Sequence, residues 1–288
     1  MISDITLGQY FPGKSVIHRL DPRTKILLTV LYIVSVFLAN TPVVFLLLLV
    51  SVFLMILISR ISLRVILRGI RPIIYVLIIT ALINVLMTKG NSEPLVSFGV
   101  IKIYKEGIVR AVFMALRVIL LIVGTSVLLT YTTSPISLTD GIEKLLAPLK
   151  KIGIPVHVFA MMMTIALRFI PTLVEETEKI MNAQKSRGAD FSSGSLIKRA
   201  KALIPILIPL FVSAFKRADE LAVAMECRCY RGDKNRTKLV KLKYKGIDFL
   251  WFGFGLVFLG AVIALKIAPE YVVEFIPKSV FDIIFYRI

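Results

Sequence analysis

Long stretches of mainly apolar residues alternate with short polar segments through the first half of the chain and recur near its end. Five such blocks cover about residues 22–39, 42–59, 70–88, 107–131 and 248–267. A helix needs about 20 residues to cross the hydrocarbon core of a bilayer, and each block reaches that length once its flanks are included. The pattern therefore predicts five membrane-spanning helices.

The first block is bounded by recognisable helix signals. Asp21 suits an N-cap position, and Pro22 suits the first helical position, where its missing N–H costs nothing. The segment Asn40-Thr41-Pro42 predicts a tight turn before the second block. The first helix is therefore expected to be short, and tilted or packed against its neighbours.

Composition supports a membrane protein. Hydrophobic residues make up 57% of the 288 residues, whereas Lys and Arg outnumber Asp and Glu by 36 to 18. A soluble protein of this size could not hide so much contiguous apolar sequence. The basic residues fall between the apolar blocks, so they indicate membrane topology and not a nucleic-acid surface.

The basic residues also predict orientation, because cytoplasmic loops carry an excess of Lys and Arg. Two segments are strongly basic, and their cations are Lys14, Arg19, Arg23 and Lys25 before the first block and Arg60, Arg64, Arg68 and Arg71 after the second. The turn at 40–42 is uncharged, and residues 132–248 hold 20 Lys/Arg against 11 Asp/Glu. We expect a cytoplasmic N-terminus, four crossings within residues 1–131, a cytoplasmic region at 132–247, and a last crossing with an external tail at 248–288.

The predicted cytoplasmic region is unusually apolar. It contains "VHVFAMMMTIALRFI" at 156–170 and "ALIPILIPLFVSAF" at 202–215. Long helices at or beneath the membrane interface, offering apolar surface to proteins or lipid, explain this best. Met161, Met162 and Met163 suit such a surface, because Met adapts to changing partners, but Met also fills gaps in protein cores. Both interpretations stay open at this point.

One short stretch, "GQYFPGKS" at 8–15, matches the phosphate-loop pattern G-x-x-x-x-G-K-[ST]. That pattern binds nucleotide only between a buried strand and a helix. Too few residues precede Gly8 for such a strand, and Pro22 interrupts any helix launched from Ser15. Neither the two cysteines nor the two histidines have metal-ligand spacing. We therefore expect no nucleotide site, metal, cofactor or catalytic centre in this chain.

Two polar stretches end alike. The first closes with Ser186-Arg187-Gly188, and the second with Cys227-Arg228-Cys229 followed by Tyr230-Arg231-Gly232. A cation followed by glycine is typical of a helix C-terminus, because glycine adopts the left-handed conformation and the cation complements the helix dipole. By spacing alone, Arg231 before Gly232 is the better counterpart of Arg187 before Gly188.

Four segments together carry a family resemblance, namely "HRLDPRTK" (18–25), "LRFIPTL" (167–173), "AQKSRGAD" (183–190) and "RADELAVAMECRCYRG" (217–232). They resemble the transmembrane T component of energy-coupling factor (ECF) transporters, which take up vitamins and some metal ions in prokaryotes. The resemblance implies an all-α integral membrane protein of the cell membrane, with about five transmembrane helices and three cytoplasmic coupling helices. It also implies a non-catalytic subunit that holds two ABC-type ATPases and a small substrate-binding S component.

The same resemblance assigns roles to residues. In this family two short Arg-centred motifs, typically Ala-Arg-Gly, insert into grooves on the ATPases. They match Ser186-Arg187-Gly188 and Cys227-Arg228-Cys229, with Arg231 as the alternative that spacing favours. The second match departs from the usual pattern because Cys229 replaces a glycine. Met161, Met162 and Met163 are the candidates for contact with the S component.

Two other classes of membrane protein fit this sequence less well. A self-contained secondary transporter usually places acidic groups at the membrane midplane and contains internal repeats, and an intramembrane enzyme needs paired catalytic groups. The clear ionisable residues inside a predicted span are Arg110 and Arg117, seven residues apart on one face. We expect them to line a protein interface or to extend their charges toward the membrane surface.

Overall fold

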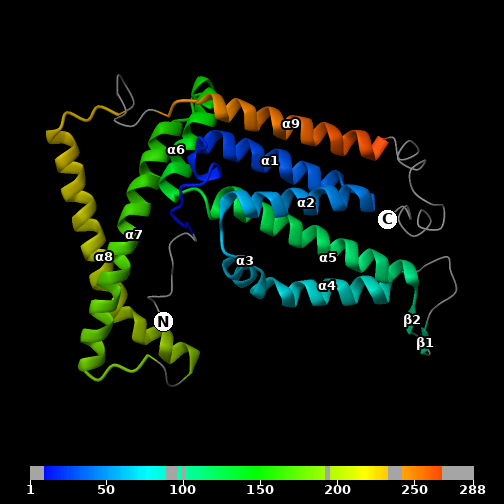
Figure 1. Cartoon of the computed structure of the whole chain (residues 1–288). Coiled ribbons are helices and arrows are strands. Elements are labelled where there is room, and N and C mark those ends of the chain that lie inside the picture. Colours follow the sequence, from blue (N-terminus) through cyan, green and yellow to red (C-terminus); the bar gives the residue numbers. More distant parts are fainter. Residues whose placement is uncertain (1–9, 89–95, 99–100, 192–194, 233–241, 268–288) are drawn as a thin grey trace. The chain divides into compact units, whose positions relative to one another are not determined.

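The computed structural model describes residues 10–88, 96–98, 101–191, 195–232 and 242–267 (Figure 1). These residues separate into two compact units. The helical bundle comprises the described residues from 10 to 134 and from 242 to 267, and the long-helix unit comprises those from 135 to 232. Most of them are helical, which confirms the all-α prediction.

The helical bundle is formed mainly by six of the described helices. These are α1 (Pro22–Leu38), α2 (Pro42–Ser59), α3 (Leu63–Ile70), α4 (Ile74–Met87), α5 (Lys105–Thr125) and α9 (Gly246–Ile267). Three short helical turns are η1 (Ile17–Arg19), η2 (Arg71–Ile73) and the π-helical η3 (Ser126–Thr130), which continues α5. Between α4 and α5, strands β1 (Val96–Phe98) and β2 (Ile101–Ile103) pair in antiparallel orientation.

The limits of α1 follow the predicted signals. Asp21 is the N-cap residue, and its carboxylate accepts a hydrogen bond of 2.9 Å from the backbone N–H of Arg23. Pro22 occupies the first helical position. The helix ends at Leu38, and α2 begins at Pro42 after a short turn. Both boundaries predicted from the sequence are confirmed.

The core of the bundle lies among α1, α2, α5 and α9. Its largest buried side chains include Tyr32, Phe45 and Leu48. The Tyr32 hydroxyl donates a hydrogen bond of 2.8 Å to the carbonyl of Leu120 on α5. The Tyr32 ring lies directly over Gly124, where an added Cβ would approach within 2.3 Å of a ring carbon. Since lipid tails are as apolar as these side chains, such close packing is what holds the helices together.

Five described helices are long and apolar enough to cross a membrane. They cover Pro42–Ser59, Leu63–Met87, Lys105–Thr130, Val156–Ser186 and Gly246–Ile267. Four of them coincide with predicted blocks, and the third block extends back to Leu63 through α3 and η2. The number of candidate spans thus agrees with the prediction of about five, with one exchange between the two sets.

The exchange concerns α1 and α7. Helix α1 has 17 residues, about 26 Å at 1.5 Å per residue, and lies at the short end of the length range of a membrane span. It contacts α9, α5 and η3, as expected for a short, packed helix. Helix α7 has 31 residues and meets the criteria of length and composition, although its sequence pattern did not predict an independent span.

The long-helix unit contains three α-helices in its described part, the number that the family resemblance implies for the coupling region. They are α6 (Pro135–Leu145), α7 (Val156–Ser186) and α8 (Leu196–Cys227), with the 3₁₀ turn η4 (Ala147–Ile152) after α6. Helix α6 packs on α7, and α7 crosses α8, so that the C-terminal ends of α7 and α8 point in opposite directions (Figure 1).

Proline residues interrupt both long helices. Pro171 lies inside α7, and Pro205 and Pro209 lie inside α8, which bends along its course (Figure 1). An interior proline removes one backbone hydrogen bond and pushes away the carbonyl four residues earlier, so it bends a helix. Both long helices therefore have built-in points of flexure.

We predict that Gly124→Ala destabilises the bundle, because the new methyl group would collide with the Tyr32 ring. Overpacking of this kind typically costs about 1–3 kcal/mol. Thermal unfolding of the purified chain in detergent should show a lower midpoint. Gly260→Ala on α9 is the matched control, since its Cβ would meet nothing within 4 Å. Equal midpoints for the two variants would contradict the packing role of Gly124.

Candidate functional site

The two predicted Arg-centred motifs occupy the C-terminal ends of α7 and α8. Ser186 is the last residue of α7, and Arg187 is its C-cap. Cys227 is the last residue of α8, and Arg228 is its C-cap. The two arginines therefore hold the same position relative to their helices.

Backbone hydrogen bonds at the two ends also correspond one to one. At the end of α7, Gly188 N–H donates to Lys185 O at 2.9 Å, and Ala189 N–H donates to Gln184 O at 3.0 Å. This pair of bonds, in which the chain reverses through one left-handed residue, defines a Schellman motif and satisfies the last free carbonyls of a helix. The end of α7 is thus fixed by its own backbone.

The end of α8 repeats this arrangement. Cys229 N–H donates to Glu226 O at 2.8 Å, and Tyr230 N–H donates to Met225 O at 3.0 Å. The left-handed residue is Gly188 (φ +86°) in the first motif and Cys229 (φ +57°) in the second. Glycine adopts this conformation without strain, whereas cysteine carries a Cβ penalty of about 1 kcal/mol. The helix end keeps its geometry at that cost.

Geometry separates the two candidates for the second motif. Arg231 also precedes a left-handed glycine, Gly232 (φ +74°). However, α8 has already ended at Cys227, so Arg231 lies in the following turn. Arg228 is the residue that occupies the same place as Arg187. Spacing to a glycine favours Arg231 because the left-handed residue at the end of α8 is Cys229 and not a glycine.

All seven motif residues lie at the surface or close to it. Ser186, Arg187, Gly188, Cys227, Arg228, Cys229 and Arg231 are exposed. Among the described residues, neither Arg187 nor Arg228 has an ion-pair partner or a side-chain hydrogen bond. Their guanidinium groups, which can form two parallel bonds to a carboxylate, are available to another molecule.

A polar contact joins α7 to α8 where they cross. The Glu176 carboxylate on α7 accepts a hydrogen bond of 2.9 Å from Arg217 Nη2 and a short one from the Ser213 hydroxyl, both on α8. The two side chains of the ion pair are partly buried, with 23% exposure for Glu176 and 37% for Arg217. Both carboxylate oxygens are thereby engaged. We call these three residues the crossing clasp.

Apolar side chains are exposed on both long helices. On α7, Met162 and Met163 are 48% and 53% exposed, whereas Met161 is partly buried. On α8, one face carries Ile204, Ile208, Phe211, Val212 and Phe215, each at least 49% exposed. Spacings of three and four residues place these side chains on one side of the helix. Met162 and Met163 therefore do not fill a core of the described chain.

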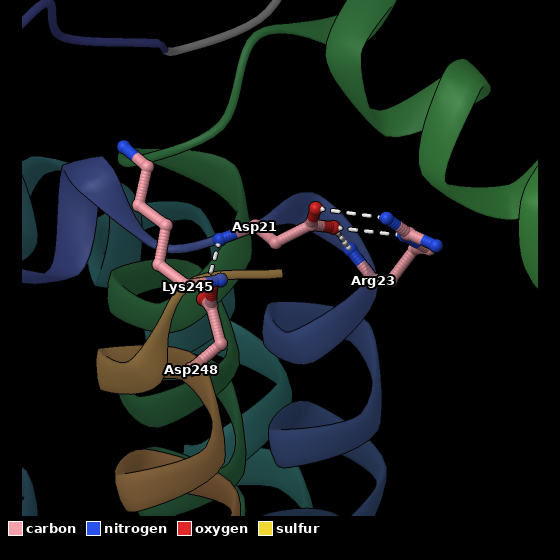
Figure 2. A network of polar contacts seen from close by, with 4 residues as sticks. All are labelled: Asp21, Arg23, Lys245 and Asp248. Carbon is pink, nitrogen blue, oxygen red and sulfur yellow. Dashed lines mark hydrogen bonds and ion pairs between the residues drawn. The ribbon is translucent and has the colours of Figure 1, made fainter. Parts of the chain in front are cut away.

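The segment "HRLDPRTK" is structural and belongs to the helical bundle. Asp248, in the first turn of α9, is 2% exposed, and its carboxylate accepts backbone hydrogen bonds from Asp21 at 2.8 Å and from Lys245 at 2.7 Å (Figure 2). The Asp21 carboxylate in turn accepts hydrogen bonds from Arg23 Nε and Nη2, both at 3.1 Å (Figure 2). The start of α9 is thus bonded to the start of α1, 227 residues away in sequence.

Lys25 extends this polar cluster toward the end of α5. Its ammonium group donates to Thr132 O at 2.8 Å, to Thr133 Oγ1 at 3.2 Å and to His18 O at 3.3 Å, and the residue is only 2% exposed. Asp21 and Asp248 also attract its charge. Two cations and two carboxylates compensate each other within this cluster, which sequence reasoning did not foresee because its members are distant along the chain.

Arg110 and Arg117 line a common cavity of about 390 Å³ with Asn40 and Asn84. Arg117 Nη2 donates a short hydrogen bond to Ala39 O at the end of α1, and its guanidinium lies 5.5 Å from the centre of the Phe45 ring. Arg117 therefore caps a helix C-terminus, where a cation is favourable. Arg117 thus contacts α1 and α2 of its own chain, and the expectation that the two arginines line a protein interface or reach the membrane surface stays a prediction.

The letters of the phosphate loop do not form a nucleotide cradle in the described residues. Gly8 lies outside them. No strand precedes Gly13 between residues 10 and 12, and the helix that follows is the three-residue turn η1. Gly13 instead packs against the His18 ring, where a Cβ would lie 2.7 Å from a ring atom. Among all the residues that the structure describes, no group of three His, Cys, Asp or Glu side chains could hold a metal ion.

Comparison with known proteins gives consistent matches over most of the chain. Residues 13–239 match the family model CbiQ, described as cobalt transport protein. The chain is 56% identical over 250 residues to the energy-coupling factor transporter transmembrane protein EcfT of Clostridium kluyveri, covering 87% of this chain and 92% of that protein. It is 53% identical to the EcfT protein of Ruminiclostridium cellulolyticum, covering 92% and 98%, and 49% identical to that of Bacillus subtilis, covering 86% and 93%.

We predict that Asp248→Asn destabilises the protein. One of the two acceptor oxygens becomes an amide donor that faces a backbone N–H, and the buried cations lose a compensating charge. The loss should be about 2–4 kcal/mol, measured as a drop in unfolding midpoint in detergent. Asp219→Asn, at an exposed position on α8, changes the net charge equally and should leave the midpoint unchanged. A similar small effect for both variants would show that the cluster does not hold α1 and α9 together.

Proposed function

Because the chain belongs to the family of energy-coupling factor (ECF) transporter transmembrane proteins, we propose that it couples two partner ABC-type ATPases to a membrane-embedded, substrate-binding S component. ATP hydrolysis in the partners would then drive uptake of a vitamin or metal ion bound by the S component. The protein is a multi-pass membrane protein and a transporter component. This membership argues against a self-contained secondary transporter and against an intramembrane enzyme.

The observation that carries this proposal is the pair of matching helix ends. Arg187 and Arg228 occupy the same C-cap position, each is exposed, and neither has a partner among the described residues. A planar guanidinium binds a carboxylate through two parallel, charge-assisted hydrogen bonds. Two equivalent arginines on two helices suit two copies, or two related copies, of one acidic groove. We propose that these grooves belong to the ATPases.

The crossing clasp supports mechanical coupling between the two anchors. Glu176 precedes Arg187 by eleven residues, and Arg217 precedes Arg228 by eleven. At 1.5 Å per residue, each anchor lies about 16 Å along its helix from the clasp. Because the clasp joins α7 to α8, a displacement of one anchor is passed to the other helix. The prolines inside both helices add flexure.

The exposed apolar residues of α7 and α8 support a further protein contact. Met162, Met163 and the α8 face from Ile204 to Phe215 would be covered by the S component or by lipid. Methionine side chains suit a partner that is exchanged or tilted during transport, since they adapt to uneven surfaces. We assign Met162 and Met163 to the S-component contact on this basis, and we include the partly buried Met161 because it directly precedes them in the sequence.

We also propose a topology with a cytoplasmic N-terminus. The cations before α1 and in the α2–α3 segment, together with the basic long-helix unit, favour the cytoplasmic side by the positive-inside rule. This orientation places both Arg-centred ends where ATPases can reach them. It also places the turn between α1 and α2 outside.

We predict that Arg187→Ala and Arg228→Ala each prevent copurification of the ATPases and abolish uptake. Removing one side of a partly buried charge pair costs about 2–5 kcal/mol, because the partner's carboxylate is left without a counter-charge. A helix-capping role would cost only about 0.3–1 kcal/mol. Arg→Lys keeps the charge but loses the planar fork, so it should resemble Arg→Ala if the residues are anchors.

Arg231→Ala is the matched control for these variants, because Arg231 is exposed and also precedes a glycine. It should assemble and transport normally, with membrane levels of the chain checked in every case. Loss at 187 and 231 but not at 228 would show that the second motif is shifted by three residues. Normal assembly and uptake for all three would refute the anchoring mechanism.

Topology can be tested by cysteine labelling in intact cells. In a background of Cys227→Ser and Cys229→Gly, a cysteine introduced as Asn40→Cys should react with an impermeant thiol reagent. One introduced as Arg64→Cys should react only after the membrane is permeabilised, since both positions are exposed but lie at opposite ends of α2. Labelling of position 64 from outside would reverse the proposed orientation.

A further inference from the structure

A second, larger cavity opens at the end of α2 that carries Arg60. It has a volume of about 920 Å³ and lies between the segment from Phe11 to His18 and the residues from Leu54 to Val65. Both walls belong to the helical bundle. We call the first wall the N-terminal strap. Lys14, the cation of the phosphate-loop letters, lines this cavity together with Arg60.

The N-terminal strap is held in place by specific bonds. Phe11 N–H donates to Tyr131 O at 3.0 Å, at the end of η3. His18 bridges the strap, since Nε2 lies 2.9 Å from Phe11 O and Nδ1 lies 2.6 Å from the Ser15 hydroxyl. Gly13 packs so closely on the imidazole that a side chain would not fit. The N-terminal strap therefore forms a well-ordered wall of the cavity on this side.

His18 takes part in that wall as a neutral ring. Burial lowers the pKa of His18, and the nearby charge of Lys25 lowers it further, while the hydrogen bond to Phe11 O raises it. A neutral imidazole with its proton on Nε2 can donate to the Phe11 carbonyl and accept from Ser15. The positive charges of the cavity are therefore those of Lys14 and Arg60.

The two parts of the cavity differ in chemistry. Lys14 and Arg60 are exposed and form no ion pair with a described residue, and the cavity lining contains no carboxylate. Leu54, Leu57 and Ile58 line the other part, with 49%, 57% and 37% exposure. They lie on the last turns of a candidate membrane span that ends at Ser59. The cavity thus reaches from hydrocarbon depth to a cationic rim.

We infer that this cavity binds an anionic phospholipid. The phosphate group lies between Lys14 and Arg60, where lysine and arginine supply charge-assisted hydrogen bonds. One acyl chain follows Leu54, Leu57 and Ile58. A free phosphate would use the cations but leave the apolar wall empty, and a nucleotide would find no backbone cradle. On the proposed topology this lipid belongs to the cytoplasmic leaflet, which is the anionic one in many membranes.

Lipid binding can be measured on the full-length chain in a non-ionic detergent. Short-chain phosphatidylglycerol and phosphatidylcholine are titrated separately, and bound lipid is counted by native mass spectrometry. Phosphatidylglycerol should bind preferentially with one molecule per chain. Since a cation near the membrane surface contributes about fivefold to anionic-lipid affinity, Lys14→Gln with Arg60→Gln should weaken binding about 30-fold. Arg60→Lys should retain most of the affinity.

The matched control is Arg64→Gln with Arg68→Gln. These residues are exposed on the adjacent helix α3 and do not line the cavity, but their removal changes the net charge equally. Affinity close to that of the unaltered chain is expected. An equal loss in the control would show general surface attraction and overturn the site.

The source of the phosphate is tested by competition and by the apolar wall. Inorganic phosphate at millimolar concentration should not displace phosphatidylglycerol, and Leu57→Asn should weaken lipid binding with both cations in place. Displacement by inorganic phosphate, with no effect of Leu57→Asn, would identify a free-anion site in place of a lipid site. Unchanged thermal unfolding of the variants in lipid-free detergent verifies that each has folded.

Discussion

The helical bundle depends on one buried carboxylate. Asp248 binds two backbone N–H groups, one from its own helix end and one from Asp21, and so fixes the first turn of α9 against the first turn of α1. A buried carboxylate is tolerated only when its oxygens are bonded and its charge is balanced, and here both conditions are met by neighbouring backbone and by two cations. Helix α1 then supplies Tyr32, whose ring sets how close α5 can approach.

Sequence patterns predicted much of this bundle because the membrane restricts the solutions. In lipid every backbone group must bond within its own segment, so long apolar blocks have to be helices, and most observed limits agree with the predicted ones within a few residues. Asp21 and Pro22 marked the start of α1 by local chemistry. By contrast, the bonds from Asp21 to Asp248 and from Lys25 to Thr132 join distant segments, and no local pattern contains that information.

At the candidate site, too, local sequence rules predicted some features and missed others. A cation beside glycine correctly marked the end of α7, since the left-handed conformation favours glycine. The same rule pointed to Arg231 on the following segment, because it could not anticipate that Cys229 adopts the left-handed conformation. The decisive signal is the pattern of backbone hydrogen bonds, which places Arg228 and not Arg231 in register with Arg187. Similarly, Gly13-Lys14-Ser15 matches the end of a phosphate-loop pattern. In the structure these residues belong to the N-terminal strap, which is held together by hydrogen bonds to His18.

The crossing clasp joins α7 and α8 at one point along each helix, at Glu176 and Arg217. The helix segments from the clasp to Arg187 and from the clasp to Arg228 are of equal length. The ends of α7 and α8 extend in opposite directions (Figure 1). If the two ATPases bind at these two ends, as we propose, the equal arms give both partners equal leverage. A symmetric displacement of both helix ends changes the angle at which α7 and α8 cross. A displacement of one end alone rotates the two helices together. On that proposal, concerted movement of both partners affects the two long helices differently from movement of either partner alone.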